Sequence, residues 1–483
     1  MLLSRVGAVW GSCVDKRRQA RVRRLVVALQ ASALPSSAPT ASVVRQAAVT
    51  LACVLAQPER DAQALVRTAL RHGSRAAELD NDDRARLATM VLGCCVLRAR
   101  LDYLLRSAGA NSAEAAVEEY ARLLVALYLL HEAPASWTPV DVGALGLRAE
   151  TLSALRASSP ALLSWPADAA ESLAAKRSLP LWLAAAFVRR FGDDGADALG
   201  AQLNAVGPVT LRVNSAKASV GAVADLLSSA GANTMPGRYA PDALRLTAGR
   251  PPLGCWSLPG WQAGLWEVQD EGSQLIALAT RAQPGETVLD YCAGNGGKTL
   301  ALASMMHSTG CILCCDISQR RLAALAASSQ RVGVAHCVHV CLDVAALAVA
   351  VAASPVDCLL VDAPCSSTGA LRRRPHARWA PGFEAEAAAA PQTQRMLMSQ
   401  AAEMQPARLV YATCSLLAEE NEEVRAWFDA TYGTQYQPWP FDAADPGPQA
   451  GPAAHERTML PHIHGTDGFY VARWRRVVSS VDK

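Results

Sequence analysis

The sequence predicts a chain in three structured parts: an all-helical region, a small mixed α+β region, and an α/β region whose mostly parallel sheet carries helices on both faces. Three observations support this prediction. Apolar residues recur at three- and four-residue spacing in 42–175, the pattern is mixed in 176–259, and short apolar runs alternate with helical stretches in 260–483. The first pattern is typical of amphipathic helices, and the last of parallel strands joined by helices.

Length and composition indicate a globular chain of more than one domain. The 483 residues exceed what one core ordinarily supports, and 51% of them are hydrophobic and 18% charged. No uninterrupted apolar run reaches the roughly 18 residues that a membrane helix needs. The 14 cysteines are too sparse for a disulfide scaffold, which favours reduced thiols and an intracellular protein. The net charge of +3 predicts that any nucleic-acid surface is local.

The first 41 residues are expected to form a basic tail or a targeting segment. Residues 1–58 carry eight Lys or Arg against Asp15 alone, and 31–44 is rich in Ser, Ala and Pro. An Arg-rich, acid-poor, Ser-rich start has the composition of an organellar transit peptide, so a mitochondrial or other organellar location is one expectation. The alternative is a plain basic tail on a cytoplasmic protein, touching RNA or nothing.

The helical region holds three amphipathic stretches: "VVRQAAVTLACVLAQ", "DDRARLATMVLGCCVLRARLDYLL" and "AAVEEYARLLVALYLL". In the mixed region, the helical "LPLWLAAAFVRRF" and "SVGAVADLLSSAG" alternate with the strand-like "VTLRVN" and "ALRLTA". The α/β region supplies six expected strands, "TVLDYC", "CILCCDI", "HCVHVCLDV", "VDCLLVDAP", "RLVYATC" and "GFYVARWRR". Helical stretches such as "GKTLALASMM", "QRRLAALAASSQRVG" and "QTQRMLMSQAAEM" separate the early strands, which predicts parallel crossovers.

The stretch "VLDYCAGNGGKT" is a strand, a glycine-rich turn and the start of a helix. Its glycines let the backbone approach a ligand closely, and the free N–H groups of the helix favour a polar or anionic group. Asp316 ends the next expected strand, where an acidic side chain can accept ribose hydroxyls, and Asp343 ends a third, where it could face an adenine edge. A glycine turn alone is often only a tight junction. Acidic residues at successive strand ends favour a nucleoside cofactor. The spacing of the glycines matches neither the dinucleotide-binding motif G-x-G-x-x-G nor the phosphate-binding motif G-x-x-x-x-G-K-[ST].

Two cysteines follow neighbouring strands of the expected sheet. Cys365 comes after the fourth strand in "VDAPCSS", and Cys414 after the fifth in "YATCSLL". A single cysteine after a strand is usually a buried, inert thiol. Two of them at adjacent carboxyl ends, each followed by Ser, predict one pocket that uses both thiols.

These motifs resemble those of the RsmB/Nop/Sun family of RNA (cytosine-5)-methyltransferases. The segments "VQDEGSQLIA", "CAGNGGKT", "DAPCSSTGALRRRPHARW", "YATCSLLAEENEEV" and "DGFYVARW" occur in the family's order, and the resemblance covers 42–474. It implies a Rossmann-like class I methyltransferase domain at 260–483 that uses S-adenosyl-L-methionine. It also implies an all-α NusB-like RNA-binding domain at 42–175 and a linker subdomain at 176–259. Apart from the resemblance, a monomer without metal or membrane attachment is expected.

The resemblance also implies roles for three residues. Cys414 would add to cytosine C6, so that C5 can attack the methyl group of the cofactor. Asp362 would hold the N3/N4 edge, either as a neutral acid or paired with protonated N3. Cys365 would help to remove the C5 proton and release the product. A DNA-type cytosine methyltransferase would instead suggest Cys365 as nucleophile from its Pro-Cys pair, but the second cysteine and the motif order argue against that.

Further residues are expected around this site. The cofactor is expected against Cys292, Ala293, Gly294, Asn295, Gly296, Gly297, Lys298, Asp316, Arg321, Asp343 and Asp362. Lys298 would lie near the base or the cofactor carboxylate, the alternative being a solvated first-turn lysine. RNA phosphates are expected at Arg372, Arg373, Arg374 and Arg378. Metal sites at "CILCC" and "HIH" are set aside because neither has a second ligand pair.

The chain departs from the family's usual motifs at two places. It has Gly294-Asn295 where the family usually has Ala-Pro, and Ser367 where the family usually has Gly. Asn also suits turns, so cofactor binding is expected to survive. The expected substrate is an unstacked cytosine in ribosomal RNA. The alternatives are a transfer-RNA cytosine-5 methyltransferase, or a ribosome-assembly factor that keeps the fold without activity.

Overall fold

The structure is a computed structural model, and it describes residues 39–57, 62–72, 79–109, 116–137, 142–161, 163–249, 254–341 and 355–477. The first 38 residues, and with them nearly all of the expected tail or targeting segment, lie outside the described residues. The same holds for Asp343, one of the expected cofactor residues.

Eight α-helices are described before the first strand. They are α2 (Ala41–Leu55), α3 (Ala62–His72), α4 (Asn81–Val96), α5 (Arg98–Ser107), α6 (Val117–Leu127), α7 (Ala149–Ala157), α8 (Ala169–Arg177) and α9 (Leu181–Asn204). The Thr40 hydroxyl caps α2 by accepting the Val43 N–H, and the apolar face of the helix is buried at Val44 and Leu51. The predicted helical region is thus helical, while its likeness to NusB stays a prediction.

The chain divides into two compact units, and the division differs from the predicted boundary at 175. One unit contains α2, α3, α6 and α7 with nearly all of α4, and the other contains Cys95–Leu104, Ala161–Thr247 and Leu258–Lys483. Most of α5 therefore belongs with the second unit. The reason is visible in its contacts, because the Ala99 N–H donates to Ser178 Oγ at 3.0 Å. Sequence periodicity marks a helix but not the partner against which it packs.

A small antiparallel sheet lies within the second unit. Its strands are β1 (Thr210–Val213), β2 (Thr234–Pro236), β3 (Ala243–Leu246) and β4 (Trp266–Val268), in the order β2-β3-β1-β4, and α10 (Val220–Ser229) packs on it. The predicted α+β region is present, but its predicted end at residue 259 is too early. Trp266, buried within β4, pairs with Val213 and so ties this segment to the small sheet.

The large sheet has eight strands. They are β5 (Thr287–Asp290), β6 (Cys311–Cys315), β7 (Val338–Cys341), β8 (Cys358–Asp362), β9 (Arg408–Thr413), β10 (Tyr436–Pro438), β11 (Glu456–Met459) and β12 (Phe469–Arg476). Their order is β10-β12-β9-β8-β5-β6-β7, with β11 beside β12. Strands β5 to β9 run parallel, and β12 joins antiparallel to β9. The predicted mostly parallel sheet is confirmed.

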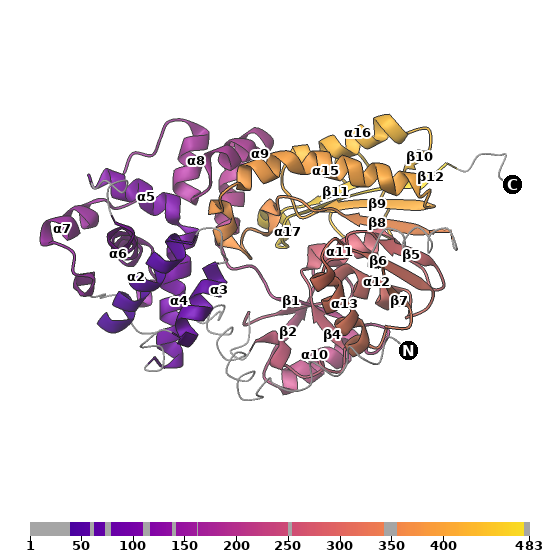
Figure 1. Ribbon diagram of the computed structural model, residues 1–483, viewed down its shortest axis with the longest axis horizontal. Coiled ribbons are helices and arrows are strands. Elements are labelled where there is room, and N and C mark those ends of the chain that lie inside the picture. The colour runs from indigo at the N-terminus through magenta and orange to yellow at the C-terminus, as the bar shows by residue number, and fades with distance from the viewer. Residues whose placement is uncertain are drawn as a thin grey trace. The chain divides into compact units, whose positions relative to one another are not determined.

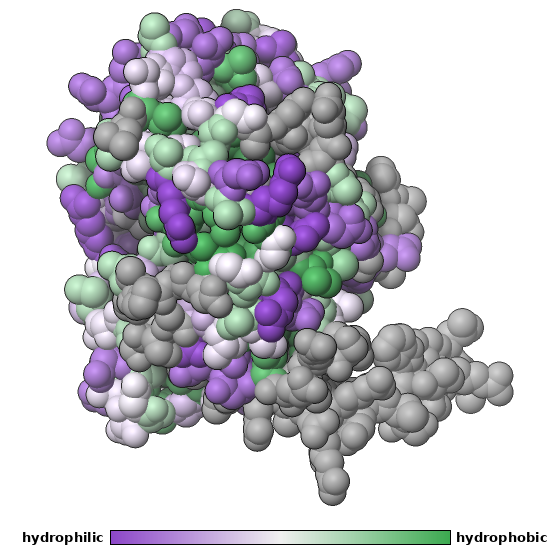
Figure 2. All heavy atoms as spheres, turned by 90° about the vertical axis from the view of Figure 1, so that its left-hand side faces the viewer, coloured by the Kyte–Doolittle hydropathy of each residue, from purple (hydrophilic) through white to green (hydrophobic). Residues whose placement is uncertain are grey.

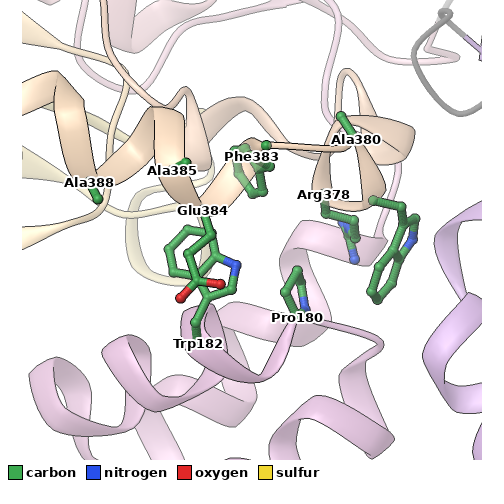
Figure 3. Close-up of a pocket in the computed structure, with 10 residues that line it drawn as sticks. Pro180, Trp182, Arg378, Ala380, Phe383, Glu384, Ala385 and Ala388 are labelled. Carbon is green, nitrogen blue, oxygen red and sulfur yellow. The ribbon is translucent and has the colours of Figure 1, made fainter.

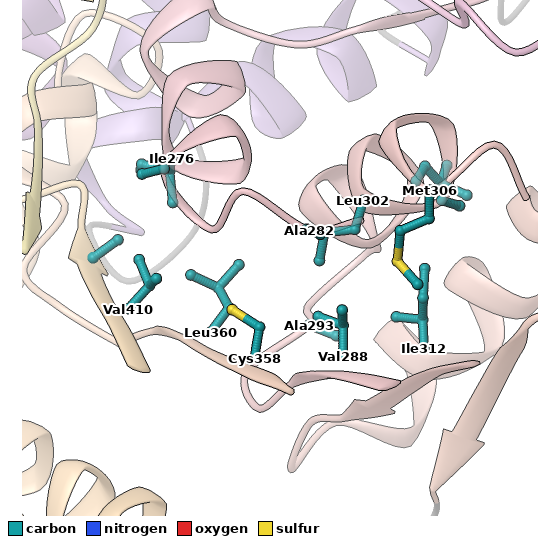
Figure 4. Packing of buried hydrophobic residues seen from close by; sticks show 14 of the residues in the cluster. Ile276, Ala282, Val288, Ala293, Leu302, Met306, Ile312, Cys358, Leu360 and Val410 are labelled. Atoms are coloured by element: carbon teal, nitrogen blue, oxygen red, sulfur yellow. The ribbon is translucent and has the colours of Figure 1, made fainter. Parts of the chain in front are cut away.

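Helices cover both faces of the large sheet (Figure 1). Alternate strand residues point to opposite faces, so Val288 and Leu360 pack on one face and Leu289 and Leu359 on the other. The first face is covered by α11 (Glu271–Ala279), α12 (Gly297–Met305) and α13 (Gln319–Val332). Figure 4 shows Ile276 of α11 and Leu302 of α12 packed above strand residues of this face. The second is covered by α15 (Phe383–Glu403) and α16 (Glu422–Tyr432), and a short α17 (Pro461–His464) precedes β12.

The surface of the molecule mixes polar and apolar side chains. One face carries a hydrophobic area near its centre with hydrophilic residues around it (Figure 2). Among the described helices, none is both long enough and apolar enough to cross a membrane. Within the same residues, no group of three or more His, Cys, Asp or Glu side chains could hold a metal ion.

Candidate active site

Acidic side chains and cysteines gather at one edge of the large sheet, where its parallel strands end. Asp290 ends β5 and Asp362 ends β8, while Asp316 directly follows β6 and Cys414 directly follows β9. Strand β8 pairs with both β5 and β9, so Asp362 lies between two other strand ends. Because ligands of open α/β sheets bind outside the carboxyl ends of the strands, this edge is the candidate active site.

The glycine-rich turn between β5 and α12 has a closed side and an open side. Gly294 has φ 56° and Gly296 has φ 88°, both in the left-handed region. A Cβ on Gly296 would lie 2.2 Å from Leu325 Cδ1, whereas a Cβ on Gly294 would meet nothing within 4 Å. The turn therefore closes against α13 and leaves the Gly294 backbone open, and α12 begins at Gly297 with free N–H groups.

Asp316 holds this turn in place. Its Oδ2 accepts the Gly294 N–H at 2.9 Å, and its Oδ1 accepts the Ser318 N–H at 2.7 Å. The Arg321 guanidinium lies 3.7 Å from Oδ2 and is itself exposed. Other expected cofactor residues share the turn: Cys292 is half-buried, Ala293 buried and Asn295 exposed. The structure thus brings the expected cofactor residues from 292 to 321 to one edge.

Ile317, directly after Asp316, was missed from the sequence. Its side chain is fully exposed and directly follows the Asp316 carboxylate in the chain. An apolar side chain, a carboxylate and open glycine backbone together suit a ligand that has both a flat ring and hydroxyl groups. The only sign in the sequence was an aliphatic residue placed just past the end of a strand.

Asp290 is a second residue that the sequence reasoning did not single out. It is fully buried, its Oδ2 accepts the Thr299 hydroxyl at 2.7 Å, and its Oδ1 has no hydrogen-bond partner within the described part of the chain. Burial is the main cause that raises the pKa of Asp290 to about 7, and the nearby Asp362 adds to it. A strand-end acid at this turn is therefore partly protonated near neutral pH.

The Asp290→Asn variant should show a smaller decline of stability with rising pH than the wild type. In the folded protein Asp290 keeps its proton up to about pH 7. In the unfolded chain its pKa has the ordinary value of 3.8, so the proton is released above about pH 4. Stability therefore falls between about pH 4 and 7, by on the order of 3 kcal/mol for this group. Melting temperatures measured from pH 5 to 8 check this, and parallel curves for the two proteins would contradict it.

Lys298 forms an ion pair with Asp362 across the site. Its Nζ lies 2.6 Å from Asp362 Oδ2, and the Phe469 ring centroid is 5.8 Å away. Burial alone would lower the pKa of Lys298, but the charge and hydrogen bond of Asp362 overcome that effect and raise it. Lys298 is therefore not a solvated first-turn lysine, and the ammonium leaves Asp362 Oδ1 for another partner.

The two cysteines predicted to share a pocket lie together. Cys365 Sγ and Cys414 Sγ are 3.3 Å apart, although the residues are 49 positions apart in the chain. The loop after β8 is tied to the loop after β9 by the backbone, because the Gly369 N–H donates to Cys414 O at 2.9 Å. Parallel neighbours β8 and β9 thus deliver both thiols to one point.

The two thiols differ in acidity. The hydrogen bond between the sulfur atoms raises the pKa of Cys365 well above its ordinary value, and burial adds to this. The same hydrogen bond is the main cause that lowers the pKa of Cys414, against the opposing effect of burial. Because the thiolate is the nucleophilic form of cysteine, Cys414 is the more readily activated of the pair.

A buried carboxylate, Glu420, joins the two cysteine loops, and the sequence reasoning missed it. It accepts the Ser366 N–H at 2.9 Å and the Ser415 hydroxyl at 2.6 Å, and it also accepts the Ser366 hydroxyl. Gln394 of α15 donates to it at 2.9 Å. Each serine directly follows one of the cysteines, so Glu420 sets the spacing of the two thiols. Its donors lie up to 54 positions away, which is why the sequence did not reveal the contact.

The Glu420→Gln variant should lower both stability and turnover. The amide nitrogen cannot accept the serine donors, and unpaired buried donors cost about 1–3 kcal/mol in the free energy of unfolding. A displacement of the thiols by about 1 Å should lower kcat on the order of 10²-fold. The exposed Glu423→Gln serves as the matched control, and equal kcat values for the two variants would contradict the assignment.

Three of the four arginines expected to bind RNA form ion pairs or hydrogen bonds with other residues of the protein. Arg372 is buried and pairs with Asp467 at 2.5 Å. Arg373 pairs with Asp467 at 2.8 Å and with Asp270 at 3.0 Å. Arg378 is also buried, and its guanidinium donates to Ser178 O, Leu203 O and Asn204 Oδ1. These contacts correct the expectation for the buried Arg372 and Arg378, because a guanidinium enclosed in the interior cannot bind an RNA phosphate. Arg373 keeps 31% of its side chain exposed, so its contact with RNA stays a prediction. Arg374 alone of the four is exposed.

Arg378→Met should therefore affect the stability of the protein, whereas Arg374→Ala should affect RNA binding. Arg378→Met leaves buried acceptors unpaired and should cost on the order of 3 kcal/mol in the free energy of unfolding. Arg374→Ala should leave stability unchanged. It should reduce the slope of the logarithm of the RNA-binding constant against the logarithm of salt concentration by about 1. Urea unfolding and RNA binding at several salt concentrations check both, and a stable Arg378→Met with weakened RNA binding would restore the original expectation.

A pocket of about 570 Å³ is lined by residues at the starts of α9 and α15 and by the segment just before α15. Pro180, Trp182 and Phe383 line it together with the Arg378 side chain (Figure 3). The ring centroids of Trp182 and Phe383 are 5.3 Å apart in an edge-to-face arrangement. The lining of this pocket includes none of the expected catalytic or cofactor residues, so the pocket is separate from the candidate active site.

Comparison with known proteins assigns the chain to a family. Residues 277–475 match the family model described as 16S rRNA methyltransferase RsmB/F, and 179–251 match its ferredoxin-like domain. A Synechocystis protein named probable ribosomal RNA small subunit methyltransferase B is 33% identical over 307 residues, which cover 63% of this chain and 68% of that protein. A mouse 28S rRNA (cytosine-C(5))-methyltransferase is 30% identical over 287 residues, covering 57% of this chain and 36% of that protein.

A solved structure supports the same assignment. A methyltransferase homologue from Pyrococcus horikoshii superposes with a TM-score of 0.55 and 25% identity, covering 65% of this chain and all of that one. A TM-score above 0.5 means that the two chains share their overall fold over this region. The relatives, together with the two cysteines at adjacent strand ends and the glycine turn, lead to one conclusion. The chain belongs to the RsmB/Nop/Sun family of S-adenosylmethionine-dependent RNA (cytosine-5)-methyltransferases.

Proposed function

We propose that this chain transfers a methyl group to C5 of a cytosine in ribosomal RNA through a covalent adduct on Cys414. The observation that carries the proposal is the thiol pair. Cys414 and Cys365 lie 3.3 Å apart at the strand edge that also holds the Lys298–Asp362 ion pair. Methylation at C5 needs one group that attacks C6 and another that helps to remove a proton, and two thiols of different acidity suit these two tasks.

The cofactor fits the glycine turn. When bound, S-adenosyl-L-methionine supplies an electrophilic methyl group. Asp316 would accept ribose hydroxyls with the lone pairs that Gly294 and Ser318 leave free. Ile317 offers an apolar surface for the adenine ring, and the free N–H groups at the start of α12 favour a carboxylate. The remaining turn residues, from Cys292 to Gly297, would line the same site.

Asp362 would orient the target base. Its Oδ2 is held by Lys298, so Oδ1 can accept from the N3/N4 edge of cytosine. Of the two arrangements expected from the sequence, we propose the one in which Asp362 pairs with protonated N3, because Lys298 already holds its Oδ2 in an ion pair. The carboxylate would then stabilise the proton that N3 carries as C6 is attacked. Lys298 acts through Asp362 and is a positioning residue.

The cysteines would act in sequence. Cys414, the more acidic thiol, adds as thiolate to C6 and makes C5 nucleophilic. After C5 has gained the methyl group, the C5 proton passes to the sulfur of Cys365, which must be in its thiolate form to accept it. The C6–sulfur bond then breaks, the C5–C6 double bond returns, and Cys414 is free again.

Ribosomal RNA is the proposed substrate because both the bacterial and the mouse relative are named for it. The target cytosine must leave the base stack to reach thiols set between strand ends, so a single-stranded or opened segment is expected. The exposed Arg374 follows the Cys365 loop and would contact the phosphate backbone.

Methylation of bulk RNA by the full-length protein tests the proposal. Ribosomal and transfer RNA from cells that lack the protein would be incubated with it and labelled S-adenosylmethionine, and then sequenced after bisulfite treatment. We expect new 5-methylcytosine in ribosomal RNA alone. Modification of transfer RNA alone would replace the substrate, and no incorporation with either RNA would favour an assembly factor without activity.

A further inference from the structure

Ser367 lies in the Cys365 loop with a backbone conformation that serine rarely adopts. Its φ is 57°, in the left-handed region, where a Cβ costs roughly 1 kcal/mol or more and glycine is preferred. The neighbouring Thr368 starts a short helical turn, and the Ala370 N–H donates to Ser367 O at 3.0 Å. Serine at this position therefore has a less favourable backbone conformational energy than glycine would have.

The Ser367 hydroxyl points at the proposed nucleophile. Its Oγ lies 3.3 Å from Cys414 Sγ. The same sulfur atom of Cys414 also lies 3.3 Å from Cys365 Sγ. A hydroxyl can accept from the neutral thiol and, after rotation, donate to the thiolate. The second contact of the hydroxyl, with Cys365 O, is longer at 3.5 Å. Cys414 is therefore the principal partner of this hydroxyl.

The residues on both sides fix the position of Ser367. Ser366 is held by Glu420 through its backbone and its hydroxyl. On the other side, the Thr368 hydroxyl accepts the Leu416 N–H at 2.8 Å. Because both neighbours are anchored to the Cys414 loop or to Glu420, the Ser367 oxygen is held in place before substrate binds, and only its hydroxyl hydrogen has to rotate when charge appears on the sulfur.

We infer that Ser367 is a further catalytic residue, whose hydroxyl donates a hydrogen bond to the Cys414 thiolate as it forms and again when it leaves C6. This inference rests on the proposed function of Cys414. A donor to the thiolate favours the charged form of a buried thiol, which burial alone would disfavour. The contact with Ser367 is the second cause, after the Cys365 hydrogen bond, that lowers the pKa of Cys414.

Other groups that face Cys414 must be kept constant in any test. Cys365 and Asp362 face it from the end of β8 and the loop beyond, and Lys298 faces it from α12. Glu420 acts on Cys365 from the loop after β9. A change at Ser367 alone leaves these titratable and charged groups in place.

Two variants separate the hydroxyl from the backbone. Ser367→Ala removes the hydroxyl and keeps the Cβ, whereas Ser367→Gly removes both. The pKa of Cys414 would be measured in the free, full-length protein from the pH dependence of iodoacetamide alkylation, by mass spectrometry of the peptide that carries Cys414. We expect both variants to be alkylated at pH 7 about 3- to 10-fold more slowly than the wild type. The melting temperature should rise by roughly 2 °C in Ser367→Gly relative to Ser367→Ala.

Ser308 provides a matched control, because it has the same φ of 57° and lies in the turn between α12 and β6. Ser308→Gly should raise the melting temperature without changing the alkylation of Cys414. Single-turnover methylation by Ser367→Ala should be slow at pH 6.5 and approach the wild-type rate as pH rises, because the thiolate fraction recovers.

Two results would overturn the inference. One is an unchanged alkylation profile in both Ser367 variants, and the other is a change in Ser367→Gly alone, which would assign the effect to the backbone. Alkylation needs no RNA, so a shifted profile in a protein without methyltransferase activity would defeat the proposed function and leave the hydrogen bond established.

Discussion

The Cys414→Ala variant should lose methyl transfer by on the order of 10⁴-fold or more, because no other group can add to cytosine C6 from the same position. Cys414 is part-buried between Cys365 Sγ and the Ser367 hydroxyl. Removing its sulfur should leave the fold intact, since the loop is held by Glu420 and by backbone hydrogen bonds. Transfer of labelled methyl groups to RNA measures the loss.

The exposed Cys53→Ala, on α2, is the control for this experiment and should retain full activity. Cofactor binding, measured by calorimetry, should be equal in the wild type and Cys414→Ala. Retained turnover in Cys414→Ala, together with loss in Cys365→Ala, would move the nucleophile to Cys365, as in a DNA-type cytosine methyltransferase.

The Cys365→Ala variant should complete one methyl transfer per molecule and then stop as a covalent complex with RNA. Cys414 can still attack, but release needs assistance at the C5 proton, and the partner thiol 3.3 Å away is gone. The complex should survive denaturation and appear as a slower band in a denaturing gel, with steady-state turnover reduced on the order of 10²-fold or more.

The double variant Cys365→Ala, Cys414→Ala is the control and should form no complex. Loss of the hydrogen bond from Cys365 should also move the pKa of Cys414 upward, because this bond is the main cause that lowers it. The complex should therefore form more slowly than in the wild type at pH 6.5 and at a similar rate at pH 9. Full steady-state turnover without any complex would contradict the role of Cys365.

Much of this site follows from the sequence for one physical reason. Hydrophobic runs locate strand ends, and parallel strands bring their carboxyl ends to one edge, so residues such as Asp362, Cys365 and Cys414 could be placed together from the order of strands and helices alone. The glycine turn could be placed by the same logic. The family resemblance then supplied the roles that spacing alone does not reveal.

The rest depended on burial and on partners far away in the chain. Arg378 looks like a phosphate-binding residue in a basic loop, yet its acceptors are Ser178 O, Leu203 O and Asn204 Oδ1, which lie 174 to 200 residues earlier. Glu420 stands in an acidic run that suggests a solvated helix start, and only the fold reveals that it is buried against the cysteine loops. Local patterns reveal periodicity and chain geometry, but not which charged side chains become enclosed.

The central claim is that Cys414 forms the bond to RNA, and peptide mapping of the trapped complex tests it most directly. The Cys365→Ala protein would be incubated with its RNA and S-adenosylmethionine, digested with protease and nuclease, and analysed by mass spectrometry. We predict a methylated cytidine nucleotide attached to the peptide that contains Cys414. A nucleotide attached to any other residue, or a methylated RNA product with no covalent complex at any time point, would contradict the account.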